Sequence, residues 1–120
     1  MITCLIIDDS SFSRHIMSKV LHSIGYAVDE VDGGQLGLDA VHHGEYDLVF
    51  LNLNMPDVDG FDVLEELHIT GHHPPVVVVT ANIDEQSRSR CYSLGAAGFV
   101  NTPLFQHEHK VRSLIETVLV

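Results

Sequence analysis

The sequence has few basic residues, few cysteines and no long hydrophobic run, and each shortage excludes a class of protein. Six of the 120 residues are Lys or Arg, against 17 Asp and Glu. Phosphates of nucleic acids and anionic membrane surfaces are bound through Lys and Arg, so we expect the chain to bind neither by itself. No apolar run approaches the ~18 residues that a membrane span needs.

The N-terminus and the cysteines indicate the compartment. MITCLIIDD has neither the basic region nor the small-residue cleavage site of a signal peptide, which predicts a cytoplasmic protein. Cys4 lies in a predicted strand and Cys91 in a predicted helix. We expect both to be buried free thiols, because disulfides are rare in the cytoplasm and free cysteines behave as small apolar residues.

Apolar residues alternate between the spacing of strands and that of helices. Five short apolar runs predict strands, and five stretches with apolar residues every three or four positions predict helices. The strands are apolar on both faces, as in a parallel sheet covered by helices on each side. With no linker or repeat, residues 1–120 are predicted to form one doubly wound α/β domain, with strands at Ile2–Ile7, Tyr26–Val31, Asp47–Leu51, Pro74–Ala81 and Gly98–Asn101.

Helix boundaries follow from capping residues. Ser10 or Ser11 and, later, Asp84 are predicted helix starts. Glycines are predicted to end the first three helices, at Gly25, Gly44 and Gly71.

Polar residues follow the predicted strands at their carboxyl ends. In doubly wound folds the ligand crevice lies outside this edge of the sheet. We therefore expect the side chains that follow four of the strands to converge: Asp8, Asp9, Asn52, Thr80 and Thr102.

Four segments carry a resemblance to a known family. LIIDDSSFSR, DLVFLNLNMPDVDGFD, VVVVTA and GAAGFVNTP are similar, in order and spacing, to the motifs of the receiver domain of bacterial two-component response regulators, particularly the single-domain chemotaxis type. The similarity extends from Ile2 to about Val118. It implies a flavodoxin-like (βα)5 fold with strand order 2-1-3-4-5, and a signalling module rather than an enzyme.

The resemblance also implies roles for single residues. In that family an acidic pair binds Mg²⁺, and Asp8 and Asp9 match this pair, with the backbone carbonyl of Asn54 as a further ligand. A hydroxyl residue that binds the phosphoryl group is matched by Thr80. An aromatic residue that changes rotamer with this hydroxyl residue is matched by Phe99.

Two positions depart from the family pattern. Asn52 stands where an Asp accepts a phosphoryl group from a histidine kinase, and Thr102 stands where a Lys precedes Pro103. Attack on a phosphoramidate needs a carboxylate oxygen, and the Lys would be the fixed cation beside the phosphoryl group. One departure removes a negative charge and the other a positive charge, so their electrostatic effects nearly cancel.

These departures predict an atypical receiver domain that acts as a phosphorylation-independent protein-interaction module. Mg²⁺ binding is expected to be weak or lost, because the third carboxylate is missing. Residues 1–82 hold 13 of the 17 acidic residues and two basic ones, whereas residues 83–120 hold four of each. A histidine kinase or another signalling protein is expected to bind through residues 83–120, which form the output and dimer surface in the family. The domain is expected to be a monomer or a weak homodimer.

The alternative is an active phosphoacceptor. Asp57 or Asp59 could replace the usual acceptor, or Asn52 could be an engineered substitution of a natural Asp. Asp57 and Asp59 lie in PDVDG and are expected to be turn residues instead. Asp8 and Asp9 could equally be a turn and capping pair. A flavodoxin-like cofactor binder is disfavoured, because DDSSFSR lacks a phosphate-cradling loop and its carboxylates would repel phosphate.

Two further expectations concern a proline and the histidines. The Thr102–Pro103 bond is predicted to be cis, because the corresponding Lys–Pro bond of receivers is commonly cis. The cis form of an X–Pro bond has only a small free-energy cost relative to trans. The nine histidines include the pairs His42–His43 and His72–His73 and the HEH segment at residues 107–109. Adjacent side chains diverge, so we expect solvated histidines rather than a metal site.

Overall fold

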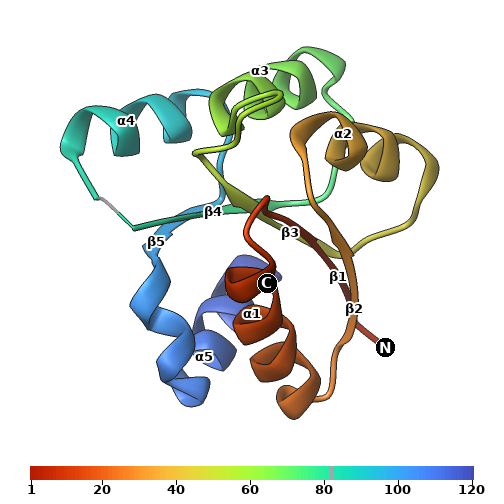
Figure 1. The fold of residues 1–120 in the computed structure, drawn as a ribbon, viewed down its shortest axis with the longest axis vertical. Helices are drawn as coiled ribbons and strands as arrows, with labels where there is room; N and C mark the ends of the chain where they lie inside the picture. The colour runs from red at the N-terminus through yellow and green to blue at the C-terminus, as the bar shows by residue number, and fades with distance from the viewer. Residues whose placement is uncertain (82) are drawn as a thin grey trace.

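The computed structural model describes residues 1–81 and 83–120. Five strands alternate with five α-helices, and a 3-10 helix follows the last strand (Figure 1). The strands are β1 (Thr3–Ile7), β2 (Ala27–Val31), β3 (Leu48–Asn52), β4 (Val76–Thr80) and β5 (Gly98–Asn101). The helices are α1 (Ser11–Ile24), α2 (Gly34–His43), α3 (Gly60–Thr70), α4 (Glu85–Ser93), η1 (Thr102–Gln106) and α5 (Glu108–Val118).

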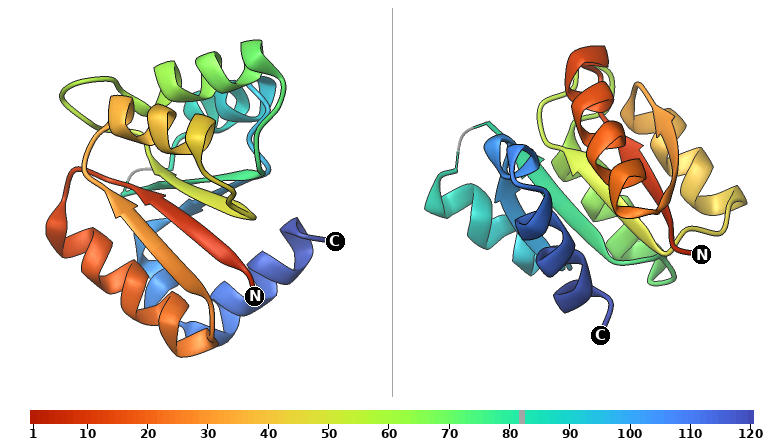
Figure 2. Two further views of the ribbon diagram at one scale, coloured as in Figure 1. Left: turned by 90° about the vertical axis from the view of Figure 1, so that its right-hand side faces the viewer. Right: turned by 90° about the horizontal axis from the view of Figure 1, so that it is seen from below.

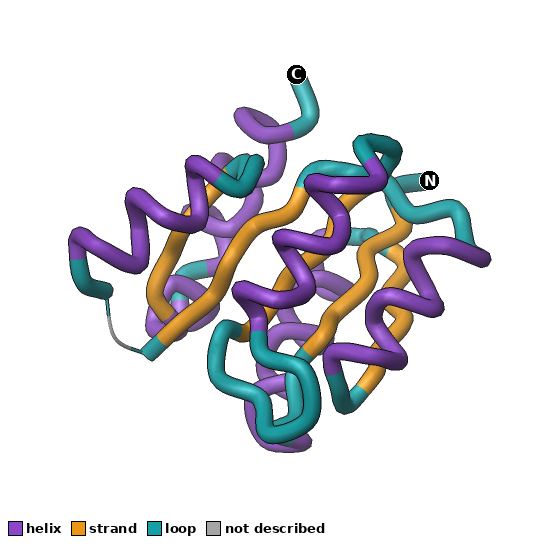
Figure 3. Tube along the Cα trace, turned by 90° about the horizontal axis from the view of Figure 1, so that it is seen from above, coloured by secondary structure: helices purple, strands orange, loops and turns teal. Residues whose placement is uncertain are grey.

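All strand pairs are parallel, and the sheet has the order β2-β1-β3-β4-β5. The predicted fold and strand order are confirmed. α1 and α5 cover one face of the sheet (Figure 2), while α2, α3 and α4 cover the other (Figure 3). Because all five strands point the same way, their carboxyl ends meet at one edge.

Alternate residues of the strands build two apolar layers, one on each face of the sheet. Val49 and Leu51 of β3 face α2, α3 and α4, whereas Leu48 and Phe50 face α1 and α5. All four are fully buried. β2 lies at the edge of the sheet, and its residues are half-buried or exposed. The central strands β1, β3 and β4 are apolar over most of their length because helices cover both of their faces.

The helix boundaries agree with the predicted caps. The Ser10 hydroxyl accepts from the backbone N–H of Ser13 at the start of α1, and Asp84 caps α4 in the same way. Gly25 and Gly71 end α1 and α3 with φ of 106° and 75°, a left-handed conformation that only glycine adopts without strain. Gly44 ends α2. The strands begin or end up to two residues away from their predicted bounds.

The connection after β5 differs from its prediction. The Thr102–Pro103 peptide bond is trans, so the prediction of a cis bond is wrong. Thr102 and Pro103 begin η1, which was not predicted, and proline suits the first turn of a helix because its φ is fixed and an N–H is not needed there. The Phe105 ring packs edge-on against Phe50, with ring centroids 5.5 Å apart, and holds η1 on the sheet.

Cys4 and Cys91 are buried free thiols, as predicted. Burial raises the pKa of Cys4 to about 12 and that of Cys91 to about 11. Both thiols therefore stay protonated at neutral pH and serve as core residues. Within the described ranges, the helices are all too short or too polar to span a bilayer.

Candidate functional site

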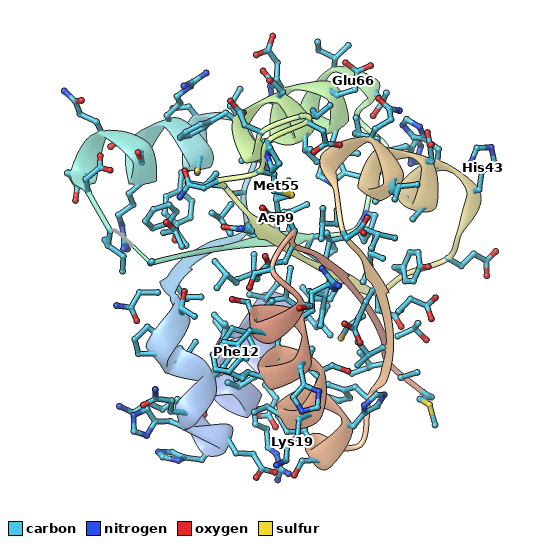
Figure 4. All side chains as sticks on the ribbon, in the orientation of Figure 1. Asp9, Phe12, Lys19, His43, Met55 and Glu66 are labelled. Atoms are coloured by element: carbon cyan, nitrogen blue, oxygen red, sulfur yellow. The ribbon has the colours of Figure 1, made fainter. Side chains whose placement is uncertain are left out.

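Neighbouring strands bring the predicted site residues to one edge of the sheet. The β1–β3 pairing ends at Ile7 and Leu51. Asp8 directly follows β1 and Asn52 is the last residue of β3, so the two lie beside each other. Thr80 ends β4 at the same edge and is buried, as is Asp8. In Figure 4, Asp9 lies between the first turn of α1 and the loop between β3 and α3.

The side-chain amide of Asn52 is the centre of a hydrogen-bond network. Its nitrogen, Nδ2, lies 3.2 Å from Asp8 Oδ1, 3.3 Å from Asp9 Oδ1 and 3.2 Å from the backbone oxygen of Asn54. Its oxygen, Oδ1, accepts from the backbone N–H of Asn54 at 3.3 Å. Both ends of the amide therefore have partners, and its orientation is fixed: three acceptors face the nitrogen and a donor faces the oxygen.

Asp8 is the buried member of the acidic pair, with 4% of its surface exposed. Burial raises the pKa of its carboxyl group, and the neighbouring charge of Asp9 adds to this. The backbone N–H of Ser10 donates to Asp8 Oδ1 at 2.9 Å and acts in the opposite direction. Arg14 donates from Nη1 to the backbone oxygen of Asp8 and lies 3.4 Å from Glu30. Asp8 thus makes a turn contact with Ser10, whereas the cap of α1 is Ser10 itself.

Thr102 and Phe99 lie outside the Asn52 network as far as the described residues show. Thr102 lies at the start of η1 and lines an apolar hollow with Phe12, Ile16 and Pro103. Phe99 is buried, and its ring belongs to the apolar layer under α3 and α4. The structure therefore joins Asp8, Asp9, Asn52 and Asn54 directly and adds Thr80 at the same edge.

The two other acids of the β3–α3 loop cap helices. Asp59 Oδ1 accepts from the backbone N–H of Asp62 at 3.0 Å, at the start of α3. The carboxylate of Asp57 accepts from the backbone N–H groups of Gly34 and Gln35, at 3.2 and 3.3 Å, and so caps α2 across 23 residues of sequence.

The Asp57 contact was not predicted, although the sequence contains a signal for it. A β-carbon on Gly34 would overlap the backbone oxygen of Val58, so the glycine allows the loop to approach the start of α2. Hydrogen bonds from backbone N–H groups lower the pKa of Asp57; the bond from Val58 has the larger effect, and the bond from Gly34 comes next.

Asp57→Asn is expected to lower the melting temperature at neutral pH. A carboxyl group whose pKa is lowered by folding stabilises the protein above its unfolded pKa of about 4 and loses this effect as the pH falls through the folded value. The difference in melting temperature between Asp57→Asn and the natural chain should therefore become smaller as the pH is lowered. Thermal unfolding over a pH series measures this difference, with Glu65→Gln on the exposed face of α3 as the control. Equal melting temperatures at neutral pH would contradict the cap.

Oxygen atoms around Asn52 are of the kind that hard divalent cations take as ligands: two carboxylates and a backbone carbonyl. No histidine belongs to this set. Neither here nor elsewhere in the described ranges are three His, Cys, Asp or Glu side chains grouped to hold a metal ion.

Comparison with known proteins supports the family assignment. A model of the response regulator receiver domain matches residues 4–115. The probable transcriptional regulatory protein SilR of Salmonella typhimurium is 34% identical over 113 residues, 92% of this chain and 50% of that protein. The sensory/regulatory protein RpfC of Xanthomonas campestris is 31% identical over 104 residues, 83% of this chain and 14% of that protein. The chain thus spans half or less of the length of these relatives.

Solved structures agree on the fold. The chemotaxis protein CheY4 of Vibrio cholerae matches with a TM-score of 0.89 and 22% identity over 99% of both chains. A CheY-like receiver domain from Methanospirillum hungatei matches with a TM-score of 0.89 and 20% identity, over 99% of this chain and 94% of that one. The family model covers all the site residues described above, and the chain belongs to the response regulator receiver domains of two-component signalling.

Proposed function

We propose that this receiver domain is not phosphorylated at position 52 and acts as a phosphorylation-independent protein-interaction module. The observation that carries the proposal is the amide of Asn52 at the end of β3, held by hydrogen bonds at both ends. A carboxamide has no anionic oxygen to attack phosphorus. Its one oxygen already accepts from the backbone N–H of Asn54.

Position 102 supports the same proposal. Thr102 is a neutral residue at the start of η1, where the family has a Lys. A fixed cation stabilises the charge that develops on a transferring phosphoryl group, and threonine supplies none. Engineered replacement of the acceptor Asp alone would leave the Lys in place, so the double departure favours a natural loss of the site.

The nearby acids do not offer a ready substitute for the acceptor. Asp57 and Asp59 each accept backbone N–H groups at a helix start. A carboxylate that attacked phosphorus would give up these hydrogen bonds and uncap α2 or α3. This supports the inactive module over an alternative acceptor in the β3–α3 loop.

The proposed partner surface is formed by residues 83–120. These residues carry no net charge, and they expose Ile83 and Tyr92. Ile83 also lines a hollow with Pro103 and Lys110. We propose that a histidine kinase or another signalling protein binds to this surface. We also propose that the domain is a cytoplasmic monomer or weak homodimer without enzymatic activity. Neither nucleic acid nor a membrane is a proposed partner.

Incubation with acetyl phosphate and Mg²⁺, followed by intact-mass spectrometry, tests the proposal. The natural chain should gain no phosphoryl group over the time in which a receiver with an Asp at this position is labelled. Rapid labelling of the natural chain would overturn the proposal. In that case Asp57→Asn and Asp59→Asn would identify the acceptor by loss of the label.

A further inference from the structure

We infer that the side-chain amide of Asn52 takes the place of a divalent cation among the oxygens of Asp8, Asp9 and Asn54, so that Mg²⁺ can bind only by displacing it. The inference rests on the proposed function, because it concerns the same residue. It adds a role for that residue: Asn52 joins the two loops at this edge of the sheet by hydrogen bonds, besides lacking the reactive group.

The contacts of one nitrogen atom carry the inference. Asn52 Nδ2 lies 3.2 to 3.3 Å from three oxygens that come from two different loops. Asp8 and Asp9 follow β1, whereas Asn54 follows β3. In receivers that bind Mg²⁺, the ion joins these two loops. Here the N–H groups of Asn52 join them by hydrogen bonds instead.

For Asn52 to act as a ligand of the cation, its side-chain amide would have to rotate so that Oδ1 takes the place of Nδ2. Its nitrogen faces the oxygen set, and only its oxygen could serve as a ligand. Turning the amide by half a revolution would place Oδ1 against the carboxylates of Asp8 and Asp9. It would also place the Nδ2 hydrogens against the backbone N–H of Asn54, which now donates to Oδ1. With the amide as it is, the donor set does not fit a divalent cation.

The distances lead to the same conclusion. Mg²⁺ holds its oxygen ligands at about 2.1 Å and prefers near-octahedral geometry. The three oxygens lie 3.2 to 3.3 Å from the nitrogen that now joins them. Mg²⁺ would therefore have to draw them inward by about 1 Å. Asp8 resists such movement, because it is buried and its Oδ1 also accepts from the backbone N–H of Ser10.

The test compares Mg²⁺ binding by the natural chain with Asn52→Ala, using isothermal titration calorimetry at constant ionic strength. If the amide competes with the ion, its removal should tighten binding by about ten-fold, the equivalent of about one hydrogen bond to a charged group. Water can fill the coordination position that alanine leaves, because Mg²⁺ keeps several waters in proteins. If Asn52 were instead a weak ligand, Asn52→Ala would bind Mg²⁺ less tightly.

Asn101→Ala is the matched control. It is the same substitution on β5, at a residue that takes no part in the Asn52 network. Its Mg²⁺ affinity should equal that of the natural chain. Should Asn52→Ala fail to fold, Asn52→Ser is measured in its place and must again bind Mg²⁺ more tightly. Equal or weaker binding by the variant, or no measurable binding by either protein, overturns the inference.

A second readout follows the amide directly. The two side-chain N–H resonances of Asn52 are identified in an ¹⁵N–¹H spectrum by their absence from Asn52→Ala. They should be nearly unchanged at a Mg²⁺ concentration that half-saturates the variant, because the natural chain, which binds about ten-fold more weakly, would then be only about one-tenth occupied. Natural protein that binds Mg²⁺ tightly but is not labelled by acetyl phosphate would overturn this inference and leave the proposed function intact. Labelling by acetyl phosphate would overturn the proposed function itself.

Discussion

Asn52→Asp combined with Thr102→Lys is expected to be phosphorylated by acetyl phosphate in the presence of Mg²⁺, about 10²-fold faster than Asn52→Asp alone. The first substitution restores the carboxylate that attacks phosphorus. The second restores the fixed positive charge that stabilises the transferring group. Because both act on one transition state, their joint effect should exceed the product of the two single effects.

The strand order makes this pair of substitutions geometrically reasonable. Asn52 ends β3, Thr80 ends β4, and Thr102 follows β5 directly. Adjacent strands lie about 4.8 Å apart, so β3 and β5 are about 10 Å apart across β4. A lysine at position 102 can extend over the end of β4 toward a phosphoryl group on residue 52, with Thr80 between them. Threonine is too short to do so.

Rates are measured by intact-mass spectrometry on four chains: the natural chain, each single variant and the double variant. Thr102→Lys alone should remain unlabelled, because it restores no nucleophile. Asn52→Asp with Thr102→Met is the matched control, since methionine extends a similar side chain without the charge. Full activity in Asn52→Asp alone would show that Thr102 is irrelevant, and would point to an engineered acceptor.

The fold could be predicted because its signals are local. The central strands β1, β3 and β4 are apolar runs of a few residues, and most of their residues are buried because helices cover both faces. Ser10 and Gly25 mark the ends of α1 by their own chemistry. Strand order came from the family resemblance rather than from periodicity, which carries no information on which strands are neighbours.

Convergence of Asp8 and Asn52 could also be predicted, because residues at the carboxyl ends of neighbouring parallel strands share one edge. The orientation of the Asn52 amide could not. It depends on three acceptors and one donor that come together only when both loops are in place. The Asp57 cap on α2 was missed for the same reason, since its partners lie 22 and 23 residues away in sequence.

Phe105 explains why η1 and the trans Thr102–Pro103 bond were also missed. The segment TPLFQ is too short to show a helical period. Its conformation depends on long-range contacts, among them the edge-on packing of Phe105 against Phe50, with ring centroids 5.5 Å apart. A prediction based on the family's Lys–Pro bond does not include this contact, and the proline fits the first turn of η1 without a cis bond.

Phe105→Ala is therefore expected to reduce the free energy of unfolding by about 3–5 kcal/mol. Phe105 is 2% exposed, so alanine would leave a cavity beneath η1 as well as removing apolar contact area. The edge-on contact with Phe50 adds about 0.5–1.5 kcal/mol beyond the buried area. Urea denaturation followed by circular dichroism measures the loss as a shift of the midpoint with an unchanged slope.

Phe12→Ala is the matched control for this loss of stability, because Phe12 lies on α1 beside the hollow that Thr102 lines but is 74% exposed. Its cost should stay within about 0.5 kcal/mol, as for most surface substitutions. Phe105→Leu, which keeps most of the side-chain volume, should reduce the free energy of unfolding by less than Phe105→Ala does.

In the Asn52→Asp, Thr102→Lys background, Phe105→Ala should also slow phosphorylation, because η1 begins at the residue that carries the lysine. A loss of stability no larger than that of Phe12→Ala would show that Phe105 does not hold η1 on the sheet, and that position 102 is not fixed by this contact.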